Sequence, residues 1–392
     1  MEPPQATALS GLRVINAGQI LAAPFCATLL GEFGADVIKL ENPESPDMTR
    51  GGPSFSQENR GQRGVTISLK HDEGRALWRR LCDTADILIE NFRPGTLERY
   101  GVDPESLRST NPRLIGVRFS GYGQTGPYRD RAGFDRVALG FSGITYVTGY
   151  ADRPPVRPGY MIADYGSGLL GAFGTLLAVE ARQRTGQGQD VDVALYESMW
   201  RMSGAHATNF GLSGENRERS GNYFPGVVPA EQFETSDGHF IIINGTTDRI
   251  FVRLCEAMGQ PELAEDERFM PGAARRKNHE AIHAIVGEWV ARLTLERCQA
   301  VLDEYGIPAS KVYATSDIVA DPHYAAREQV LTVETVSGER VLQPGIAPRL
   351  TGTPGFVKGR APQLGEHNRE VFVGELGLPE AEFEEYKARG VI

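Results

Sequence analysis

The first half of the chain alternates short runs of Val, Ile and Leu with longer segments in which apolar residues recur at helical spacing. The short runs predict strands at residues 12–17, 36–41, 64–69, 86–91 and 113–120, and the longer segments predict helices at 23–35 and 72–85. Residues 188–206 repeat the pattern as a strand followed by a helix. Such alternation is typical of an α/β fold with a mostly parallel sheet covered by helices, and ligands of these sheets lie at the carboxyl ends of the strands.

The second half has a different organisation. A polar stretch rich in Gly and Pro at residues 213–230 is typical of a linker, and residues 233–244 predict a hairpin followed by several helices. Strand pattern returns at 333–345, and helices follow from residue 366. We therefore expect a large domain over residues 1–215, a smaller α+β domain with its linkers over 216–325, and a third segment over 326–392.

The composition of the chain limits the kinds of molecule that it can be expected to bind. The 392 residues carry a formal net charge of −10, which argues against nucleic acid or an anionic membrane as a partner. The four cysteines are widely spaced, as in a cytoplasmic protein with reduced thiols. The first residues lack the pattern of a signal peptide, and no uninterrupted apolar run approaches the ~20 residues of a membrane span. We expect a soluble cytoplasmic protein.

Two short motifs match by chance. Gly121, Gly123 and Gly126 fit the GxGxxG dinucleotide pattern, but Pro127 and a charged loop follow where that motif needs a helix. The stretch from His279 to His283 fits HExxH, but an amphipathic helix explains it, because no third zinc ligand follows. We expect neither a bound nicotinamide or flavin nor a metal.

Asp164 begins a run that is otherwise without charge and contains Gly166, Gly168, Gly171 and Gly174. One reading is a helix N-cap, because aspartate is among the best capping residues. The other is a nucleophile, kept ionised by the helix N-terminus and approached closely by a ligand over the bare glycines. Residue spacing does not decide between the two.

Basic residues follow the predicted strands. Lys70 ends one strand, and Arg93 and Arg99 follow another in a glycine-containing loop. Each alone is typical of a solvated surface charge. Together at the carboxyl edge of a sheet they suit an anionic ligand that carries phosphates.

The chain resembles the class III CoA-transferases, the family of formyl-CoA and carnitine CoA-transferases that also includes α-methylacyl-CoA racemase. The resemblance extends from residue 9 almost to the C-terminus. The segments that carry it are LLGEFGADVIKLENPESPDMTR, NRGQRGVTISLKHDEG, ADILIENFRPGTLERYGVD, IADYGSGLLGAFGTLLA, RTGQGQDVDVALYESM, GIPASKVYATSDIVADPH and LGEHNREVF.

The resemblance implies roles for particular residues. The family's aspartate nucleophile corresponds to Asp164, and Gly166 and Gly168 would allow close approach and hold an oxyanion. The implied CoA contacts are Ile67, Ser68, Leu69, Lys70, Asn91, Phe92, Arg93, Arg99, Phe134 and Asp135. Asn42 stands where some members have a basic residue, a charge that Arg131 would have to replace.

The resemblance also implies an activity and an assembly. The activity is transfer of CoA from an acyl-CoA to a free carboxylic acid through aspartyl anhydride and aspartyl–CoA thioester intermediates, with the CoA thioester as substrate and no permanently bound cofactor. The assembly is an interlocked homodimer of Rossmann-like large domains, each completed by residues 326–392.

Two alternatives are a racemase or isomerase of the same family and a CoA-binding protein without transfer activity. Phe134 replaces the histidine that racemases use, and phenylalanine cannot transfer a proton. The acid pair is not identified. The loops at residues 120–128 and 244–249 are expected to select it, and Arg249 would be available to a second carboxylate.

Overall fold

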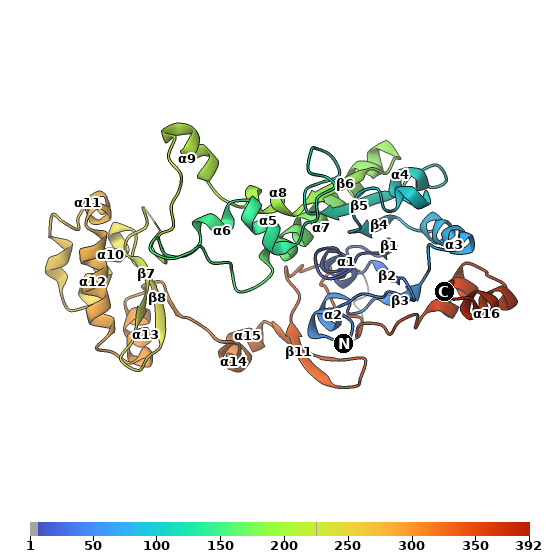
Figure 1. Ribbon diagram of the computed structural model, residues 1–392. Coiled ribbons are helices and arrows are strands. Elements are labelled where there is room, and N and C mark those ends of the chain that lie inside the picture. Colours follow the sequence, from blue (N-terminus) through green and yellow to red (C-terminus); the bar gives the residue numbers. More distant parts are fainter. Residues whose placement is uncertain (1–6, 225) are drawn as a thin grey trace. The chain divides into compact units, whose positions relative to one another are not determined.

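The computed structural model describes residues 7–224 and 226–392, which divide into two compact units (Figure 1). The large unit comprises Met1–Thr145, Arg157–Asn216 and Ala326–Ile392. The small unit comprises Tyr146–Val156 and Arg217–Ala325. The unit boundaries at 216/217 and 325/326 therefore lie beside those expected from the sequence, but residues 146–156 belong to the small unit.

The large unit is built on a six-stranded parallel sheet with strand order β3-β2-β1-β4-β5-β6. Its strands are β1 (Arg13–Asn16), β2 (Asp36–Glu41), β3 (Arg63–Thr66), β4 (Ile87–Glu90), β5 (Ile115–Ser120) and β6 (Asp190–Ala194). The α/β class expected from the sequence is confirmed. Strands β1 to β5 are buried along nearly their whole length, because helices cover both faces of the sheet.

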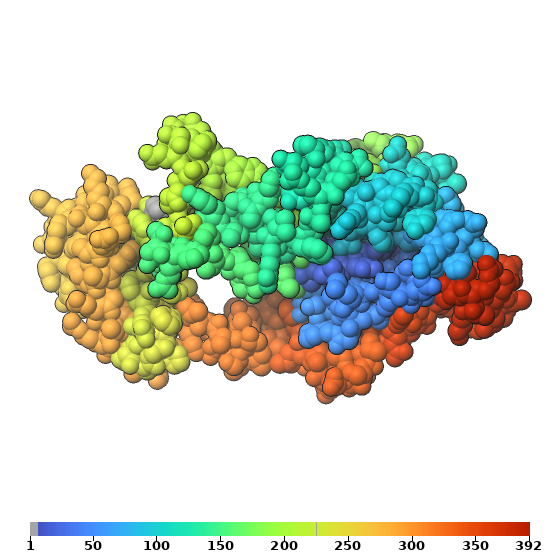
Figure 2. Space-filling model, in the orientation of Figure 1, coloured from blue at the N-terminus to red at the C-terminus, as the bar shows by residue number. Residues whose placement is uncertain are grey.

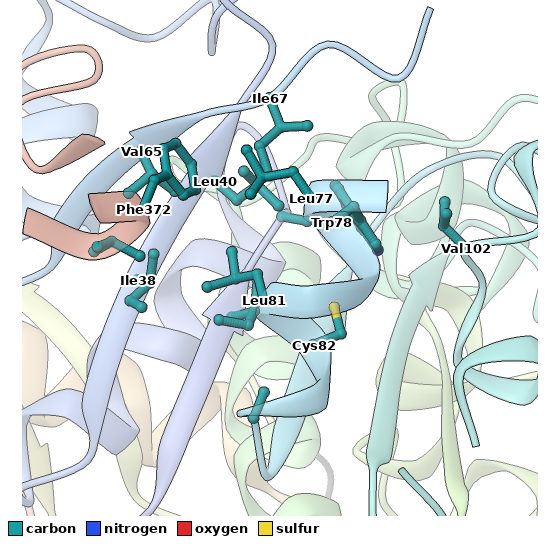
Figure 3. Packing of buried hydrophobic residues seen from close by; sticks show 14 of the residues in the cluster. Ile38, Leu40, Val65, Ile67, Leu77, Trp78, Leu81, Cys82, Val102 and Phe372 are labelled. Atoms are coloured by element: carbon teal, nitrogen blue, oxygen red, sulfur yellow. The ribbon is translucent and has the colours of Figure 1, made fainter. Parts of the chain in front are cut away.

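The helices of the large unit form two layers with separate cores. They are α1 (Ala22–Glu32), α2 (Pro53–Glu58), α3 (Asp72–Asp83), η1 (Glu98–Tyr100), α4 (Pro104–Leu107), α5 (Asp135–Phe141), α7 (Ile162–Thr185), α8 (Leu195–Arg201), α9 (His206–Ser213), η3 (Arg369–Glu375) and α16 (Glu380–Ala388). On one face, Leu77 and Leu81 of α3 pack with Ile38 and Leu40 of β2 (Figure 3). On the other face, α1 and α7 share a core with Val37 and its neighbours.

The C-terminal segment completes the first of these cores. Phe372 of η3 is fully buried beside Ile38, Val65 and Leu81 (Figure 3). The backbone N–H of Ser68 donates to the carbonyl of Val391 at 2.8 Å. The red C-terminal segment and the blue N-terminal segment therefore lie side by side, as Figure 2 also shows.

Helix α7 is long and apolar enough, by length and composition alone, to cross a membrane. It packs, however, as a core helix of the large unit, against α1, α8, β5 and β6. Its C-terminal turn is tied to the sheet by Arg182, whose side chain pairs with Asp86 at 2.9 Å and donates to the carbonyl of Arg113 at 3.1 Å. The absence of a membrane partner remains a prediction from the sequence.

The remaining elements are short. A two-stranded antiparallel ribbon in the large unit consists of β10 (Val330–Glu334) and β11 (Arg340–Pro344). The small unit holds a three-stranded antiparallel sheet and a layer of helices: β7 (Ala230–Glu234), β8 (Phe240–Asn244), β9 (Ala309–Lys311), α10 (Asp248–Ala257), η2 (Pro261–Ala264), α11 (Gly272–Lys277), α12 (His279–Val290), α13 (Leu295–Glu304), α14 (Thr315–Ala320) and α15 (Pro322–Ala326). Helix α6 (Ile144–Val147) lies at the boundary of the two units.

Hydrogen bonds explain why residues 146–156 join the small unit. Arg219 donates to the carbonyls of Tyr146 at 2.9 Å and Tyr150 at 3.3 Å, and the Gly221 N–H donates to Gly149 at 2.8 Å. The hydrophobic pattern could not reveal these contacts, because they are hydrogen bonds between polar groups far apart in the sequence.

Candidate active site

A cavity of about 240 Å³ opens at the carboxyl edge of the large unit's sheet. The strand order runs β1-β2-β3 in one direction and β4-β5-β6 in the other, so the boundary between β1 and β4 is the topological switch point at which such sheets bind ligands. The cavity lies there, because its wall follows β1, β4 and β5 in the chain. The lining residues are Gln19–Ala22, Asn91–Pro94, Phe119–Gly121, Arg131–Phe134, Asp164 and Leu195.

Asp164 lies in this wall at the third position of α7. The N-cap position belongs to Met161, which makes no side-chain capping bond, so the reading of Asp164 as an N-cap is wrong. Within residues 7–224 and 226–392, no hydrogen bond or ion pair reaches the half-buried Asp164 carboxylate. The carboxylate is therefore free to react with a molecule in the cavity.

The capping carboxylate is supplied by Asp135, the first residue of α5. Asp135 Oδ2 accepts hydrogen bonds from the backbone N–H groups of Ala163 at 2.8 Å and Asp164 at 3.4 Å. Burial, together with the negative charge of Asp135, raises the pKa of the Asp164 carboxyl to about 7. Burial and the charge of Asp135 thus oppose the ionisation of Asp164 that the helix N-terminus was expected to favour.

The glycines of α7 serve packing. A Cβ on Gly168 would lie 2.7 Å from a ring carbon of Phe25 and 2.9 Å from the carbonyl oxygen of Ala22, and Gly166 is enclosed by Met199 and Met202. Both glycines lie inside α7, where carbonyls of the helix take up their N–H groups. The expected oxyanion and close-approach role of Gly166 and Gly168 does not hold in this structure.

The loop after β1 forms one side of the cavity, although the sequence analysis assigned no role to its residues. Asn91 holds it through two hydrogen bonds: the Gln19 N–H donates to Asn91 Oδ1 at 2.8 Å, and Asn91 Nδ2 donates to the Gln19 carbonyl at 2.7 Å. Asn91 thus connects the loops of β1 and β4 across the switch point. The available signal was the position of this loop at the carboxyl end of the first strand.

Two guanidinium groups line the same cavity. Arg131 stacks on the ring of Tyr128, with 3.6 Å from its Cζ to the ring centroid. Arg93 follows β4 and is exposed. Among the residues that the structure describes, neither side chain has an acidic partner. Both charges are therefore available to an anionic ligand.

The other expected CoA contacts divide into two groups. Asn91, Phe92, Arg93 and Phe134 line the cavity with Asp164, and Asp135 lies beneath it. Ile67, Ser68, Leu69, Lys70 and Arg99 do not line it: Ile67 and Ser68 are buried behind β3, and Lys70 pairs with Glu44. A CoA contact at Ile67 or Ser68 would have to use the backbone. Asn42, the residue that replaces a basic one, accepts a hydrogen bond from the Glu44 N–H at 3.0 Å.

The two chance motifs have ordinary structural roles. Gly121 lies against the backbone of Gly133, and the next helix after this loop begins only at Asp135. His279 of α12 stacks on Tyr223 with 4.2 Å between ring centroids. No group of three or more His, Cys, Asp or Glu side chains suited to a metal was found in the described part of the chain. Gly121 lines the cavity, whereas no residue of the HExxH stretch does.

The fold and the cavity define an α/β protein with an unpartnered carboxylate at the switch point of a parallel sheet, among the residues that the structure describes. Comparison with known proteins identifies its family. The family model described as CoA-transferase family III matches residues 9–368. The chain is 40% identical over 393 residues to succinyl-CoA–D-citramalate CoA-transferase of Chloroflexus aurantiacus, covering 98% of each chain. It is 41% identical over 400 residues to the β subunit of succinyl-CoA–L-malate CoA-transferase from the same organism, again covering 98% of each.

A solved structure shows the same fold. The crystal structure of a CAIB/BAIF family protein from Brucella suis superposes with a TM-score of 0.84 at 36% identity, covering 95% of this chain and 100% of that one. The chain therefore belongs to CoA-transferase family III and is an enzyme of that class, which moves CoA between an acyl-CoA and an acid.

Proposed function

We propose that this enzyme transfers CoA from an acyl-CoA to a free carboxylic acid through covalent intermediates on Asp164. The observation that carries the proposal is the Asp164 carboxylate, which lines the switch-point cavity without a partner in the described part of the chain. A carboxylate beside an electrophilic thioester can act as a nucleophile and divide a difficult exchange into easier steps.

The first half of the reaction exchanges the acyl group and CoA on Asp164. A carboxylate oxygen of Asp164 attacks the thioester carbonyl, the C–S bond breaks, and CoA leaves as a thiolate with an acyl–aspartyl anhydride behind it. The thiolate then attacks the aspartyl carbonyl of the anhydride. The donor acid leaves as a carboxylate, and Asp164 carries CoA as a thioester.

The second half repeats these steps in reverse with the acceptor. The acceptor carboxylate attacks the aspartyl thioester and expels CoA thiolate, and the thiolate attacks the acceptor carbonyl of the new anhydride. This step releases the new acyl-CoA and restores the Asp164 carboxylate. No proton or external energy source is consumed, because one carboxylate replaces another on the same thiol.

Backbone donors suited to the transient oxyanions lie at the start of α1. Leu21 and Ala22 line the cavity with Asp164, and their N–H groups have no acceptor within the described residues. Donors held rigidly in this way stabilise charge that develops on an attacked carbonyl oxygen. We assign to them the role that the sequence analysis gave to Gly166 and Gly168.

Phe134 favours transfer over racemization. Its side chain is 63% exposed and lines the cavity, so a substrate there would meet an aromatic ring in place of an acid–base group. Racemization needs proton transfer on both faces of the α-carbon, and phenylalanine provides none.

We propose that both acids are short dicarboxylates. The two relatives named above act on succinyl-CoA with D-citramalate or L-malate, all built on four-carbon dicarboxylic chains. A second carboxylate of the substrate needs a cation in the cavity. Arg131 lines the cavity, and its guanidinium has no acidic partner among the described residues. Arg93 would then serve the CoA phosphates, as expected from the sequence.

We also propose that the enzyme is a homodimer. Leu169, Phe173 and Leu177 lie along one side of α7, with 54%, 59% and 55% of their surfaces exposed within this chain. Three large apolar side chains at helical spacing form a patch typical of a protein interface. Light scattering coupled to size-exclusion chromatography should give twice the mass of the chain, and a monomer at working concentration would contradict the proposal.

Substitution of Asp164 tests the proposed function. Asp164→Ala should lower kcat for CoA transfer by at least ~10³-fold, because removing a nucleophile eliminates the covalent route. CoA affinity, measured by calorimetry, should stay near that of the wild-type enzyme. Full activity in the variant would exclude the mechanism.

A further inference from the structure

Ile20 lies in the cavity wall in a strained conformation. Its φ angle is +69°, a left-handed value that β-branched residues rarely adopt. Such strain persists only where surrounding contacts enforce it, and it concentrates at functional sites. The question is which contacts enforce it here.

A buried ion pair provides them. Asp47 Oδ2 accepts a hydrogen bond from the Ile20 N–H at 3.0 Å and pairs with Lys39 Nζ at 3.1 Å. Lys39 Nζ also donates to the carbonyl of Gly18. The side chains of Lys39 and Asp47 are both 0% exposed. We call these two residues the clamp, because their bonds hold the Gly18–Ile20 backbone from both ends.

Further contacts fix the clamp itself. Asp47 Oδ1 accepts from both the N–H and the hydroxyl of Thr49, and the Asp47 N–H donates to Glu41 Oε1 at 3.0 Å. Burial raises the pKa of Asp47, but the Lys39 charge and the Thr49 hydrogen bonds lower it further, so the net pKa lies below the usual range. These contacts therefore favour the ionised form of Asp47.

A buried ion pair is a poor device for stability alone, because desolvation of two charges cancels much of their attraction. Its established use is to impose one conformation where several compete. Here the hydrogen bonds of the clamp converge on a loop that leads directly into Leu21 and Ala22, the part of α1 that lines the cavity with Asp164.

We propose that Lys39 and Asp47 are positioning residues for CoA transfer, which hold the strained Gly18–Ile20 backbone and thereby set the start of α1 against Asp164. The inference rests on the proposed function of Asp164. The clamp touches no substrate and acts through the loop. Its loss should therefore slow acylation of Asp164 rather than unfold the protein.

The test uses the double variant Lys39→Met/Asp47→Leu, which removes both charges at once. A protein often stays as stable when apolar residues of similar size replace a buried ion pair. We expect the single-turnover rate of Asp164 acylation by succinyl-CoA to fall at least ~10-fold, a loss typical of misplaced catalytic geometry. The melting temperature should change by only a few degrees. Asp47→Asn, which keeps the shape and one acceptor, is the second variant should the double replacement not fold.

Ile20→Gly makes the test specific to the loop. Glycine adopts positive φ without strain, so a backbone with glycine at position 20 needs the clamp less to keep its conformation. Adding Ile20→Gly to the clamp variant should reduce the effect of clamp removal from at least ~10-fold to less than ~3-fold, a coupling that a double-mutant cycle measures. Equal effects with and without Ile20→Gly would overturn the inference.

A matched control uses the buried pair of Glu32 and Arg60, which does not line the cavity. Glu32→Leu/Arg60→Met should leave the acylation rate of folded protein within ~2-fold. Unchanged acylation in the clamp variant would overturn the inference while leaving Asp164 as nucleophile. No acylation of Asp164 in the wild-type enzyme would instead refute the proposed function, and with it the inference.

Discussion

Asp135 caps the helix that carries Asp164: its Oδ2 accepts the Asp164 backbone N–H at 3.4 Å and the neighbouring Ala163 N–H at 2.8 Å. One carboxylate therefore satisfies the helix end, and the other is left without a partner in the cavity wall. Burial raises the pKa of Asp164, and the negative charge of Asp135 nearby raises it further. Asp135 both positions the proposed nucleophile and tunes it.

The pH dependence of transfer should report this tuning. Only the carboxylate form of Asp164 can attack, so kcat/KM should rise with pH through an apparent pKa of about 7. Asp135→Asn keeps an oxygen acceptor for the helix and removes the charge, which should move the rise to lower pH. The shift should be partial, because burial is the larger cause. A profile of the variant that coincides with that of the wild-type enzyme would contradict this role of Asp135.

The ionisation of Asp164 should make the fold less stable as pH rises, whereas the ionisation of an ordinary salt-bridged acid makes a fold more stable. The carboxyl has a pKa of about 7 when folded, against ~3.9 when unfolded, so its ionisation destabilises the fold increasingly as pH rises between these values. Asp164→Asn removes that cost. The melting temperature of the variant should exceed that of the wild-type enzyme clearly at about pH 8 and only slightly at about pH 5. An equal gain at both pH values would refute the raised pKa.

Gly171 should be intolerant of a side chain. A Cβ there would lie 2.3 Å from Cζ of Phe119, inside the core between α7 and the sheet. Gly171→Ala should lower the free energy of unfolding by about 1–3 kcal/mol, as overpacking does. Gly211 of α9 is the control, since no atom lies within 4 Å of its added Cβ. Gly211→Ala should be neutral or stabilise by up to ~1 kcal/mol. Urea unfolding of both variants measures the difference.

Arg131 should select dicarboxylates. Arg131→Gln removes the proposed partner of the distal carboxylate and should raise KM for an acceptor such as L-malate by about 10–100-fold, the loss expected for one charge-assisted contact. KM for a monocarboxylic acceptor should stay nearly constant. Equal effects on both acids would assign Arg131 to CoA binding or to folding.

Much of the fold follows from local pattern. Strand β2 has the bounds expected from the sequence, Asp36–Glu41, because a predicted helix ends directly before it and Asn42 and Pro43 follow it. Strand β3 ends at Thr66, three residues earlier than expected, because the Ser68 N–H donates to Val391 of the C-terminal segment. That contact joins residues more than 300 positions apart, and no local pattern encodes it.

The candidate site, like the fold, was predictable from the sequence only in part. Asp164, Arg93 and Phe134 follow from motif position and do meet in the cavity. The hydrogen bonds of Asp135 to the start of α7 and of Asp47 to Ile20 could not be predicted from the sequence. Each joins a side chain to a backbone group of a distant segment. The raised pKa of Asp164 likewise depends on burial, which the uncharged residues around it suggested but could not quantify.

The most direct test of the central claim is chemical capture of the intermediate on Asp164. The wild-type enzyme is incubated with succinyl-CoA and hydroxylamine, digested, and analysed by mass spectrometry, with Asp164→Asn as the control. Activated carboxyl groups form hydroxamates, so the account predicts an aspartyl hydroxamate at Asp164 that requires the acyl-CoA and is absent from the variant. Modification of a different carboxylate, or none during active turnover, would contradict the account.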